Sequence, residues 1–542
     1  MPRLLPRPRW AKVALLLLML FALGRSVLWA SVQPGWIAPD EDYHSLYINY
    51  LVEKDTFPNL KGPFTPPEYT TTVRLIEEGQ YLGGPVIHYS GNPHAVLSEL
   101  GGLSREPGPP PPRKVLEAPL YYIGGAILDR IVWGSVSITR LMVLRYYSAL
   151  LGMFTIYLAW LLASQVLKRE WEQLAAAAIA SLQTILAFSA STVTNDVGVA
   201  VTLTAVLAWC AWMLRGPPRS RQGIGLGILA AIALLTKTSQ LALVVIVPVA
   251  LLALWRTYPD ARRELLGVLK WAISIPLVCA GWWYVYVLIK THSILGEQGH
   301  ITSTAHTHGP GLAGLPNQAW TWIGIVYRNY WFSFLFDEVR SKSISFWVPV
   351  LGIVVVIAGL VLYLIRSRGT TFDPVDSVRR AVLLILWTSL VLFAPPFLLD
   401  IWRGIHGLYF ETAQGRFLTP AYPGLAVIAV LATGELTRYG RRAFPIATGA
   451  LVLAAFCLYW ETWLKRVLER FYGTANGHWL RLLYRASYFK PTWVTETSLA
   501  IFFGVTIAAF AIGYVVTVVG ATRRSDPSRA PTASLDSVTA AG

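Results

Sequence analysis

Long apolar runs alternate with short polar loops along almost the whole chain. Runs such as "VALLLLMLFALG" near the N-terminus and "SFWVPVLGIVVVIAGLVLYLI" near residue 350 approach or reach the ~20 residues with which a helix spans the hydrocarbon core of a bilayer. The pattern therefore predicts an all-α polytopic membrane protein with about 12 transmembrane helices. They are expected at residues 11–30, 144–167, 173–190, 196–214, 222–235, 240–256, 267–289, 346–366, 380–400, 416–436, 443–460 and 498–519.

The charges of the short loops predict how this bundle is oriented. An excess of Lys and Arg in short loops marks the cytoplasmic side of a membrane. The basic loops contain Arg3, Arg7, Arg9 and Lys12; Lys168 and Arg169; Arg215, Arg219 and Arg221; Arg256, Arg262 and Arg263; Arg366, Arg368, Arg379 and Arg380; Arg438, Arg441 and Arg442; Arg523 and Arg524. We therefore expect cytoplasmic N- and C-termini and long loops on the outer face of the plasma membrane, at residues 31–118, 290–345, 401–415 and 461–497.

Three segments need a separate interpretation. Residues 119–133, within "LEAPLYYIGGAILDRIVWG", are short and moderately apolar, so we expect an interfacial or re-entrant helix, one of several juxtamembrane helices carried by the long loops. The first 30 residues resemble a signal peptide, but the downstream topology needs them as an uncleaved anchor. Residues 1–520 then form one transmembrane domain, and residues 521–542 a disordered cytoplasmic tail.

Composition supports the membrane class and excludes several others. Of 542 residues 54% are hydrophobic and 14% charged, with a mean hydropathy of +0.48, which is too apolar for an ordinary soluble enzyme. The net charge of +16 resides in the short loops rather than on one basic surface, so a nucleic-acid partner is not indicated. The three cysteines fall inside apolar runs and predict neither a disulfide framework nor a thiolate metal site. No phosphate-binding glycine motif follows a strand, so we expect no soluble nucleotide-binding domain. If the chain is a transferase, its activated donor must be available at the outer face, where the long loops lie.

The densest acidic cluster follows the first apolar run, in "GWIAPDEDYHSLYINYLVEK". Asp40 could cap a helix there, with Glu41 and Asp42 in its first turn, where carboxylates favour the helix dipole. His44 lies one turn after Asp40, on the same face of that helix. A carboxylate with an adjacent imidazole at the membrane surface suits a general base, so Asp40, Glu41 and His44 are the catalytic candidates. The alternative use of the three acids is to bind a divalent metal, Mg or Mn.

Two cations stand at the mouths of apolar runs on the predicted outer side. Lys237, in "LLTKTSQLALVVIVP", either extends to the membrane interface or binds a phosphate. Arg416, in "RGIHGLYFETAQGRFLTP", opposes the positive-inside bias and needs an anionic partner, for which Glu411 and a lipid-linked phosphate are the candidates. Weaker signals are the loop histidines and a polar pair before another run, which either caps the next helix or lines a site: His300, His306, His308, Asn195 and Asp196.

Several segments together resemble the GT-C superfamily of membrane glycosyltransferases, which includes the protein O-mannosyltransferases and the lipid A aminoarabinose transferases. The chain is most similar to a poorly characterised bacterial multi-spanning family of that kind with a PDExxH motif. The matching segments, in order, are "APDEDYHSLYINYLVE", "APLYYIGGAIL", "SASTVTNDVGVA", "LGILAAIALLTKTSQLALVVIVPV", "GWWYVYVLIKTHSILG" and "QGRFLTPAYPGLAVI".

The resemblance implies a GT-C-like bundle and an inverting transfer of a sugar from a polyprenyl-phosphate donor to a glycan, lipid or protein acceptor at the outer face. It implies that Asp40, with Glu41 beside it, acts as base or orients the acceptor. Lys237, Arg416 and Arg403 would bind the donor phosphate. Residues expected to line the substrate site are Asp42, Tyr121, Tyr122, Glu411, Gln414 and His406.

The sequence departs from the family pattern in ways that affect the choice of acceptor. "LEAPLYY" has Glu117 and Ala118 where related chains carry His or Gln and a double proline, and we expect no soluble C-terminal domain. Two other functions remain open. A lipid-linked sugar flippase or transporter would need charges inside the spans, which are almost free of them. A non-enzymatic sugar-binding scaffold would tolerate the loss of Asp40. The sequence establishes no cofactor, and the divalent metal, Mg or Mn, at the three acids stays the alternative.

Overall fold

The computed structural model describes residues 4–36, 38–58, 67–72, 116–294, 311–331, 347–367, 376–406, 414–440, 442–460, 466–472, 479–487 and 490–523. Regular structure in this part of the chain is helical throughout. The all-α class predicted from the sequence is therefore confirmed for the described residues. The first half contains α1 (Arg9–Val32), α2 (Glu41–Lys54), α5 (Leu120–Ile131), α6 (Ser137–Val166), α7 (Glu170–Ser181), α8 (Thr184–Ser189), α9 (Asp196–Met213), α10 (Gln222–Thr236), η1 (Thr238–Ala242), α11 (Leu243–Thr257), η2 (Pro259–Ala261) and α12 (Arg262–Thr291).

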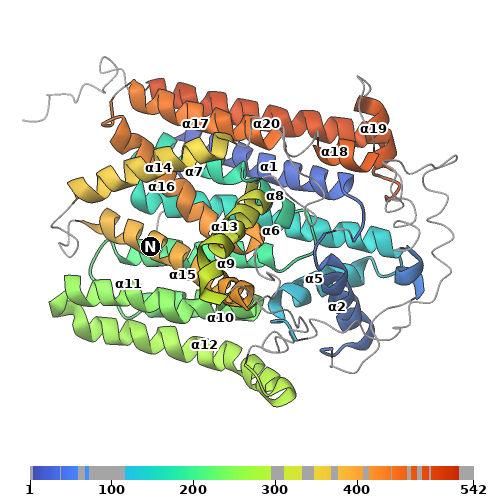
Figure 1. Ribbon diagram of the computed structural model, residues 1–542, viewed down its shortest axis with the longest axis horizontal. Helices are drawn as coiled ribbons and strands as arrows, with labels where there is room; N and C mark the ends of the chain where they lie inside the picture. The colour runs from blue at the N-terminus through green and yellow to red at the C-terminus, as the bar shows by residue number, and fades with distance from the viewer. Residues whose placement is uncertain are drawn as a thin grey trace, which may run out of the picture.

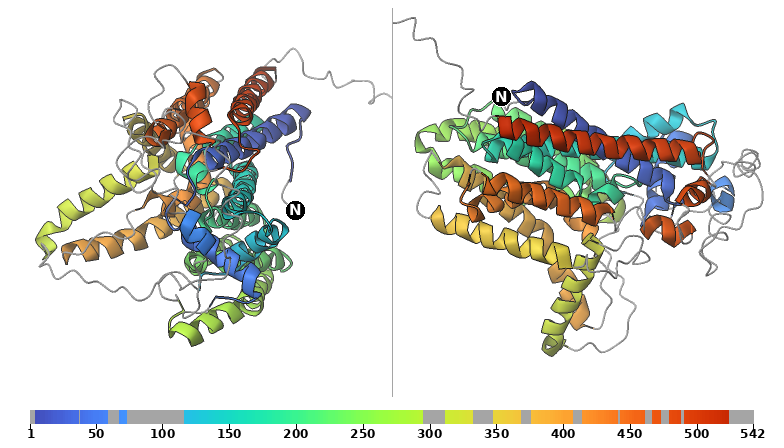
Figure 2. Two further views of the ribbon diagram at one scale, coloured as in Figure 1. Left: turned by 90° about the vertical axis from the view of Figure 1, so that its right-hand side faces the viewer. Right: turned by 90° about the horizontal axis from the view of Figure 1, so that it is seen from above.

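The second half continues the bundle and adds short helices between its long ones. Its elements are η4 (Gly311–Gly314), α13 (Leu315–Trp331), α14 (Trp347–Arg366), α15 (Ser377–Ile405), η6 (Gly415–Ala421), α16 (Tyr422–Leu436), α17 (Ala443–Trp460), α18 (Arg466–Tyr472), α19 (Trp479–Ala486) and α20 (Glu496–Arg523). Figure 1 shows the long helices lying side by side, with α2, α5, α18 and α19 gathered at one end. Figure 2 shows α13 standing steeply out of the bundle.

Ten segments in the described chain are long and apolar enough to cross a membrane. The shorter apolar helix α10 occupies the position of an eleventh predicted span, and α7 with α8 that of the twelfth, but none of these helices reaches spanning length, so the count of about 12 stays a prediction. The expected single span at 173–190 is wrong in detail, since it is two helices separated at Leu182 and Gln183. The side chain of Gln183 accepts a hydrogen bond from Leu186 N at 2.9 Å and so starts α8. Both helices are buried, so this break in the backbone lies against protein rather than lipid.

The basic loops meet at one end of the bundle, opposite α2 and α5. Hydrogen bonds join neighbouring loops there: Arg7 N to Glu170 Oε1 (3.3 Å), Arg215 Nη1 to Gln165 Oε1 (3.2 Å), Ser220 N to Glu264 Oε2 (2.7 Å), Arg380 Nη2 to Leu214 O (2.9 Å) and Arg366 Nη1 to Glu435 Oε2 (2.9 Å). The predicted alternation of basic and non-basic loops therefore corresponds to two distinct ends of the molecule.

The segment predicted as an interfacial or re-entrant helix forms α5, which is too short for a span. It packs beside α2, and its exposed face carries Ile123, Ile127 and Ile131 at helical spacing. An apolar face on a short helix at the end of a membrane bundle is typical of an interfacial helix. The predicted long loops thus carry short helices, as expected, while the depth of α5 in a membrane stays a prediction.

Candidate active site

Four charged side chains meet at the end of the bundle where α2 lies. Arg416 Nη2 lies 2.6 Å from Asp40 Oδ2, and Arg416 Nε lies 3.8 Å from Asp196 Oδ2. Lys237 Nζ lies 2.5 Å from the other oxygen of Asp196, Oδ1. These residues, here called the charge cluster, come from four segments: the residue before α2, the first residue of α9, the residue after α10, and η6. Acids and bases alternate along the charge cluster, so its formal charges balance.

The charge cluster is accessible from one side. The side chain of Asp40 is 21% exposed, compared with 14% for Lys237, 11% for Arg416 and 7% for Asp196. The cluster therefore opens at Asp40 and closes at Asp196. Arg416 Nε is buried and makes no hydrogen bond to a described residue, so the guanidinium keeps an unused donor near an acidic side chain.

Asp40 has an unusual backbone that directs its carboxylate. Its φ of 63° and ψ of 7° lie in the left-handed region, which Asp tolerates better than most residues. Asp40 precedes α2, but its side chain makes no capping hydrogen bond, so the predicted capping role is wrong. The carboxylate binds Arg416 instead, and Arg416 Nη1 also donates to Pro39 O at 3.2 Å. Outliers of this kind persist where the surrounding structure holds them, which is common at functional sites.

Arg416 is fixed by a close approach of two backbones. A Cβ on Gly415 would lie 2.5 Å from Tyr330 N and 2.6 Å from Tyr330 Cα, too close for any residue but glycine without a shift of backbone. Gln183 Nε2 donates to Tyr330 O at 3.2 Å. The break between α7 and α8 thus helps to hold the α13 backbone against which η6 packs.

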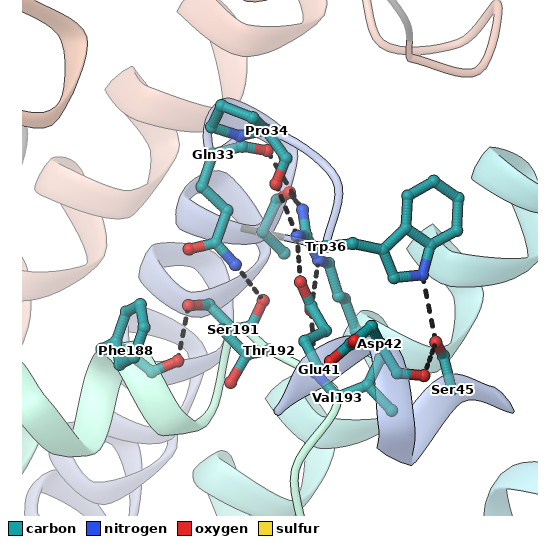
Figure 3. A network of polar contacts seen from close by, with 12 residues as sticks. Gln33, Pro34, Trp36, Glu41, Asp42, Ser45, Phe188, Ser191, Thr192 and Val193 are labelled. Carbon is teal, nitrogen blue, oxygen red and sulfur yellow. Dashed lines mark hydrogen bonds and ion pairs between the residues drawn. The ribbon is translucent and has the colours of Figure 1, made fainter. Parts of the chain in front are cut away.

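Glu41, predicted to act beside Asp40, belongs to a separate ion pair. Arg145 Nε lies 2.8 Å from Glu41 Oε1 and Nη2 lies 2.6 Å from Oε2, with both side chains fully buried. Val193 N donates to Glu41 Oε1 at 3.0 Å, and Figure 3 shows Glu41 between Val193 and the turn after α1. The same guanidinium donates to the carbonyl oxygen of Ala30 in the last turn of α1 and to those of Gln33 and Pro34 in the turn that follows. Glu41 therefore holds two segments together, and its predicted chemical role has no support in this geometry.

Asp42 lies beside Asp40 and is partly buried. Burial is the largest cause that raises the pKa of Asp42, to about 6; the nearby charge of Asp40 acts in the same direction, and the backbone N–H of Tyr43 acts in the opposite one. The two neighbouring acids thus differ, because Asp40 has a guanidinium partner and Asp42 has a pKa raised to about 6.

His44 lies in α2, buried behind the charge cluster. Its Nδ1 lies 2.7 Å from the hydroxyl of Tyr122, and the two rings stack with centroids 5.8 Å apart. Asn195 Nδ2 donates to the same hydroxyl at 3.2 Å. Tyr122, predicted to line the substrate site, is fully buried, and its hydroxyl contacts His44. Tyr121 is also buried, with its hydroxyl 2.8 Å from Ser148 Oγ.

The other predicted residues lie at the end of α15 or beyond the described chain. Arg403 is buried in the last turn of α15, close in sequence to Asp400, whose Oδ2 accepts from Trp322 Nε1 at 2.9 Å. His406 is exposed, with Nδ1 2.7 Å from Trp402 O. Gln414 directly precedes η6. Their roles in binding phosphate or substrate stay predictions. Glu411, His300, His306 and His308 lie outside the described residues.

Sequence reasoning gave Asp196 no definite role and overlooked Arg145. The sequence leaves two roles for Asp196, a helix cap or a residue that lines a site. Its ion pair with Lys237 is visible only in the three-dimensional structure. Arg145 lies inside an apolar run, and an ionisable residue in such a run is expected to have a buried partner. The expectation that the spans are almost free of charge is wrong for α1 and α6, which bury Arg25, Arg140 and Arg145.

The three consecutive acids do not point toward one common position, as a metal site made from them would require. Asp40 binds Arg416 and Glu41 binds Arg145, so adjacent residues direct their carboxylates to different partners. Within the part of the chain that the structure describes, no group of three His, Cys, Asp or Glu side chains is placed to hold a metal ion. A hard divalent cation needs several converging oxygens.

These features define the class: a polytopic, all-helical membrane protein with a charge cluster at one end of its bundle. Among solved structures it is similar to ArnT from Cupriavidus metallidurans bound to undecaprenyl phosphate, with 14% identity and a TM-score of 0.46 over 93% of this chain and 75% of that one. It is also similar to apo ArnT from the same organism, with 15% identity and a TM-score of 0.46 over 92% and 73%. At this similarity no residue role carries over to this chain. No protein-family model and no curated protein matches.

Proposed function

We propose that this protein is an inverting glycosyltransferase that moves a sugar from a polyprenyl-phosphate donor to an acceptor at the outer face of the membrane. The observation that supports the proposal best is the charge cluster, in which Asp40, Arg416, Asp196 and Lys237 alternate at one end of a membrane bundle. A lipid-linked donor needs cations for its phosphate and a base for its acceptor at one depth in the membrane.

The basic loops support the outer face as the side of the proposed site. The end of the bundle opposite the charge cluster carries the basic loops, and the positive-inside rule assigns that end to the cytoplasm. The charge cluster then faces outward, with both termini on the cytoplasmic side. A donor anchored by its lipid in the outer leaflet would reach it without leaving the membrane.

Donor binding would rearrange the ion pairs. Lys237 and Arg416 are both bound to carboxylates, and a phosphate that enters between them would replace those carboxylates as their partner. Arg416 Nε, which makes no hydrogen bond to a described residue, offers a further donor. Release of Asp40 from Arg416 would leave its carboxylate free to act as a base, so the donor itself would prepare the site.

In the chemical step, an acceptor hydroxyl or amine attacks the anomeric carbon from the face opposite the phosphate, and Asp40 takes its proton. The bond between the anomeric carbon and the phosphate oxygen breaks, and polyprenyl phosphate leaves with the electron pair. Lys237 and Arg416 stabilise the negative charge that develops on the departing phosphate. The configuration at the anomeric carbon inverts, because one displacement occurs.

The test is transfer of radiolabelled sugar from a panel of polyprenyl-phosphate sugars by purified protein in detergent, with membrane extract as acceptor. Asp40→Asn is expected to lower transfer by about 100-fold or more while donor binding persists. Asp55→Asn is the matched control, because Asp55 follows the same helix, is 74% exposed and pairs with Arg130 away from the charge cluster. Undecaprenyl phosphate is the first lipid for the binding measurement.

The outcomes separate the candidate functions. Transfer that survives Asp40→Asn would remove Asp40 from the chemical step and leave Asp42 as the acid nearest the opening. Donor binding without transfer from any donor to any acceptor fraction would contradict the enzyme proposal and favour a sugar-binding scaffold or a flippase. Loss of donor binding in Lys237→Met, with Asp55→Asn unaffected, would support the phosphate site.

A further inference from the structure

A buried chain of hydrogen bonds runs behind the charge cluster. Asn195 Nδ2 donates to Glu117 Oε2 at 3.3 Å and to the Tyr122 hydroxyl at 3.2 Å, and that hydroxyl lies 2.7 Å from His44 Nδ1. All four side chains are buried. Asn195, an inner link of this chain, directly precedes Asp196 of the charge cluster, so the chain adjoins the proposed site.

The orientation of the Asn195 amide sets the direction of this chain. The Nδ2 group uses its two hydrogens on two acceptors, whereas Oδ1 is buried without a hydrogen-bond partner in the described structure. The reversed amide would place Oδ1 against the Glu117 carboxylate, acceptor against acceptor. The charge of Glu117 therefore selects the amide orientation, even though that orientation leaves Oδ1 unsatisfied.

The next link follows from the Tyr122 hydroxyl, which has two partners. Since it accepts from Asn195, its own hydrogen is directed to His44 Nδ1. Burial raises the pKa of Tyr122 well above its ordinary value, and the Glu117 charge adds to the rise, so the hydroxyl keeps its proton. The ring is held in place by Tyr47, whose centroid is 4.0 Å away and whose hydroxyl donates to Glu117 O at 3.3 Å.

We propose that Glu117 is a positioning residue that fixes His44, through Asn195 and Tyr122, as the tautomer with its proton on Nε2. In this state His44 Nδ1 is an acceptor already in use, and the ring nitrogen away from Tyr122 is a hydrogen-bond donor. His44 is within electrostatic range of Asp196. The role of His44 toward the charge cluster and its substrate is then to donate a hydrogen bond, and the role of base falls to Asp40 alone. For its catalytic consequence the inference rests on the proposed function.

The same geometry predicts that the chain can be reversed. A neutral Glu117, or a glutamine in its place, can donate a hydrogen bond to Asn195. The Asn195 amide then rotates by about 180°, so that its Oδ1 replaces Nδ2 opposite residue 117 and the Tyr122 hydroxyl. Tyr122 would donate to Oδ1 and accept from His44 Nδ1, which would move the histidine proton from Nε2 to Nδ1. A change of one oxygen to NH₂ at residue 117 would thus reach His44 through two intervening side chains.

The test is the ¹⁵N spectrum of ¹⁵N-histidine-labelled full-length protein in nanodiscs, with the His44 signal assigned from its loss in His44→Gln. In the native chain Nε2 is expected to be protonated and Nδ1 not, and Glu117→Gln is expected to exchange the two. Tyr121→Phe is the matched control, since its buried hydroxyl bonds to Ser148 outside the chain, and it should leave the His44 signal unchanged. Tyr122→Phe keeps the stacked ring and should leave the two tautomers mixed.

A native His44 with its proton on Nδ1 would overturn the inference without any variant. An unchanged tautomer in folded Glu117→Gln, checked by its thermal transition, would do the same. If Glu117→Gln does not fold, the spectrum of Tyr122→Phe tests the inference instead. A His44 that remains entirely the Nε2 tautomer in Tyr122→Phe would show that the Tyr122 hydroxyl does not select this tautomer, and would overturn the inference. These spectra need no activity, so a native chain that transfers no sugar refutes the proposed function and leaves this inference standing.

The catalytic consequence has its own readout. If the proposed function holds, Glu117→Gln should lower kcat for transfer by about tenfold or more with donor KM nearly unchanged, since the phosphate-binding cations are untouched. A tautomer exchange with unchanged kcat would confine Glu117 to structure and overturn its positioning role.

Discussion

Glu41 and Arg145 form a closed ion pair at the residue scale, and their burial makes the pair a structural element. Both side chains are fully buried, the guanidinium makes two contacts to the carboxylate, and it also satisfies three backbone carbonyls. Glu41→Gln leaves this guanidinium without its counter-charge. Removing one partner of a buried pair costs about 3–5 kcal/mol.

We therefore expect Glu41→Gln to lower thermal stability in detergent strongly. The exposed pair of Arg130 and Asp55 is the matched control, because Asp55→Asn removes an ion pair worth less than about 1 kcal/mol. If Glu41→Gln keeps native stability and loses transfer, Glu41 acts in the chemistry and not in the structure.

The raised pKa of Asp42 predicts that the stability of the folded protein depends on pH. The pKa of Asp42 in the folded protein is raised to about 6 by burial, so between pH 4 and 6 the folded state holds a proton that the unfolded state has lost. The free energy of unfolding should therefore fall as pH rises through this window, by up to about 3 kcal/mol. Asp42→Asn should remove this dependence, measured as the thermal transition of purified protein at a series of pH values. A profile that Asp42→Asn leaves unchanged would contradict the assignment.

At the scale of elements, the position of η6 depends on Gly415. Gly415→Ala would push η6 away from the Tyr330 backbone and move Arg416 from Asp40 and Asp196. We expect binding of undecaprenyl phosphate to weaken by about tenfold, since a charge-assisted contact contributes about 1.5–3 kcal/mol. Gly352→Ala is the control, because nothing lies within 4 Å of a Cβ there. Equal binding by both variants would separate Arg416 from the phosphate.

The fold was predictable at this scale because apolar length and loop charge are local properties. The break in the 173–190 span was not predictable, because a run rich in small residues has the pattern of one continuous helix. The hydrogen bonds of Gln183 that accompany the break are visible only in the structure. One partner of Gln183, Tyr330, lies far away in sequence. Small residues such as those of α7 allow close packing of helices, so this pair of short helices is buried in protein.

The site was predictable in part for the same reason. Asp40, Lys237 and Arg416 were found as charges at the ends of apolar runs, but their pairing joins residues up to 376 positions apart. Glu41 shows that being next to Asp40 in the sequence does not predict a shared role, because neighbouring residues on a helix face different directions. The chain from Glu117 to His44 needs three segments brought together, and the sequence offered only the departure from the family pattern at Glu117 as a sign of it.

At the scale of the whole molecule, the two ends of the bundle predict opposite accessibility. Asp55, exposed at the end of α2, lies at the end that carries the charge cluster, and Pro217 is exposed in a loop of the basic end. The orientation argued from the basic loops places Asp55 outside and Pro217 in the cytoplasm. Asp55→Cys and Pro217→Cys, each in a chain whose three native cysteines are replaced by Ala, convert this difference into a labelling experiment.

In intact cells that express each variant, a membrane-impermeant maleimide should label Asp55→Cys, and it should label Pro217→Cys only after the membrane is opened. Labelling of both after opening is the control for reactivity. The reverse pattern would place the charge cluster in the cytoplasm, where a sugar donor can be a soluble nucleotide sugar. The proposed use of a lipid-linked donor would then lose its reason, because the need for a membrane-anchored sugar arises from the absence of nucleotide sugars on the outer side.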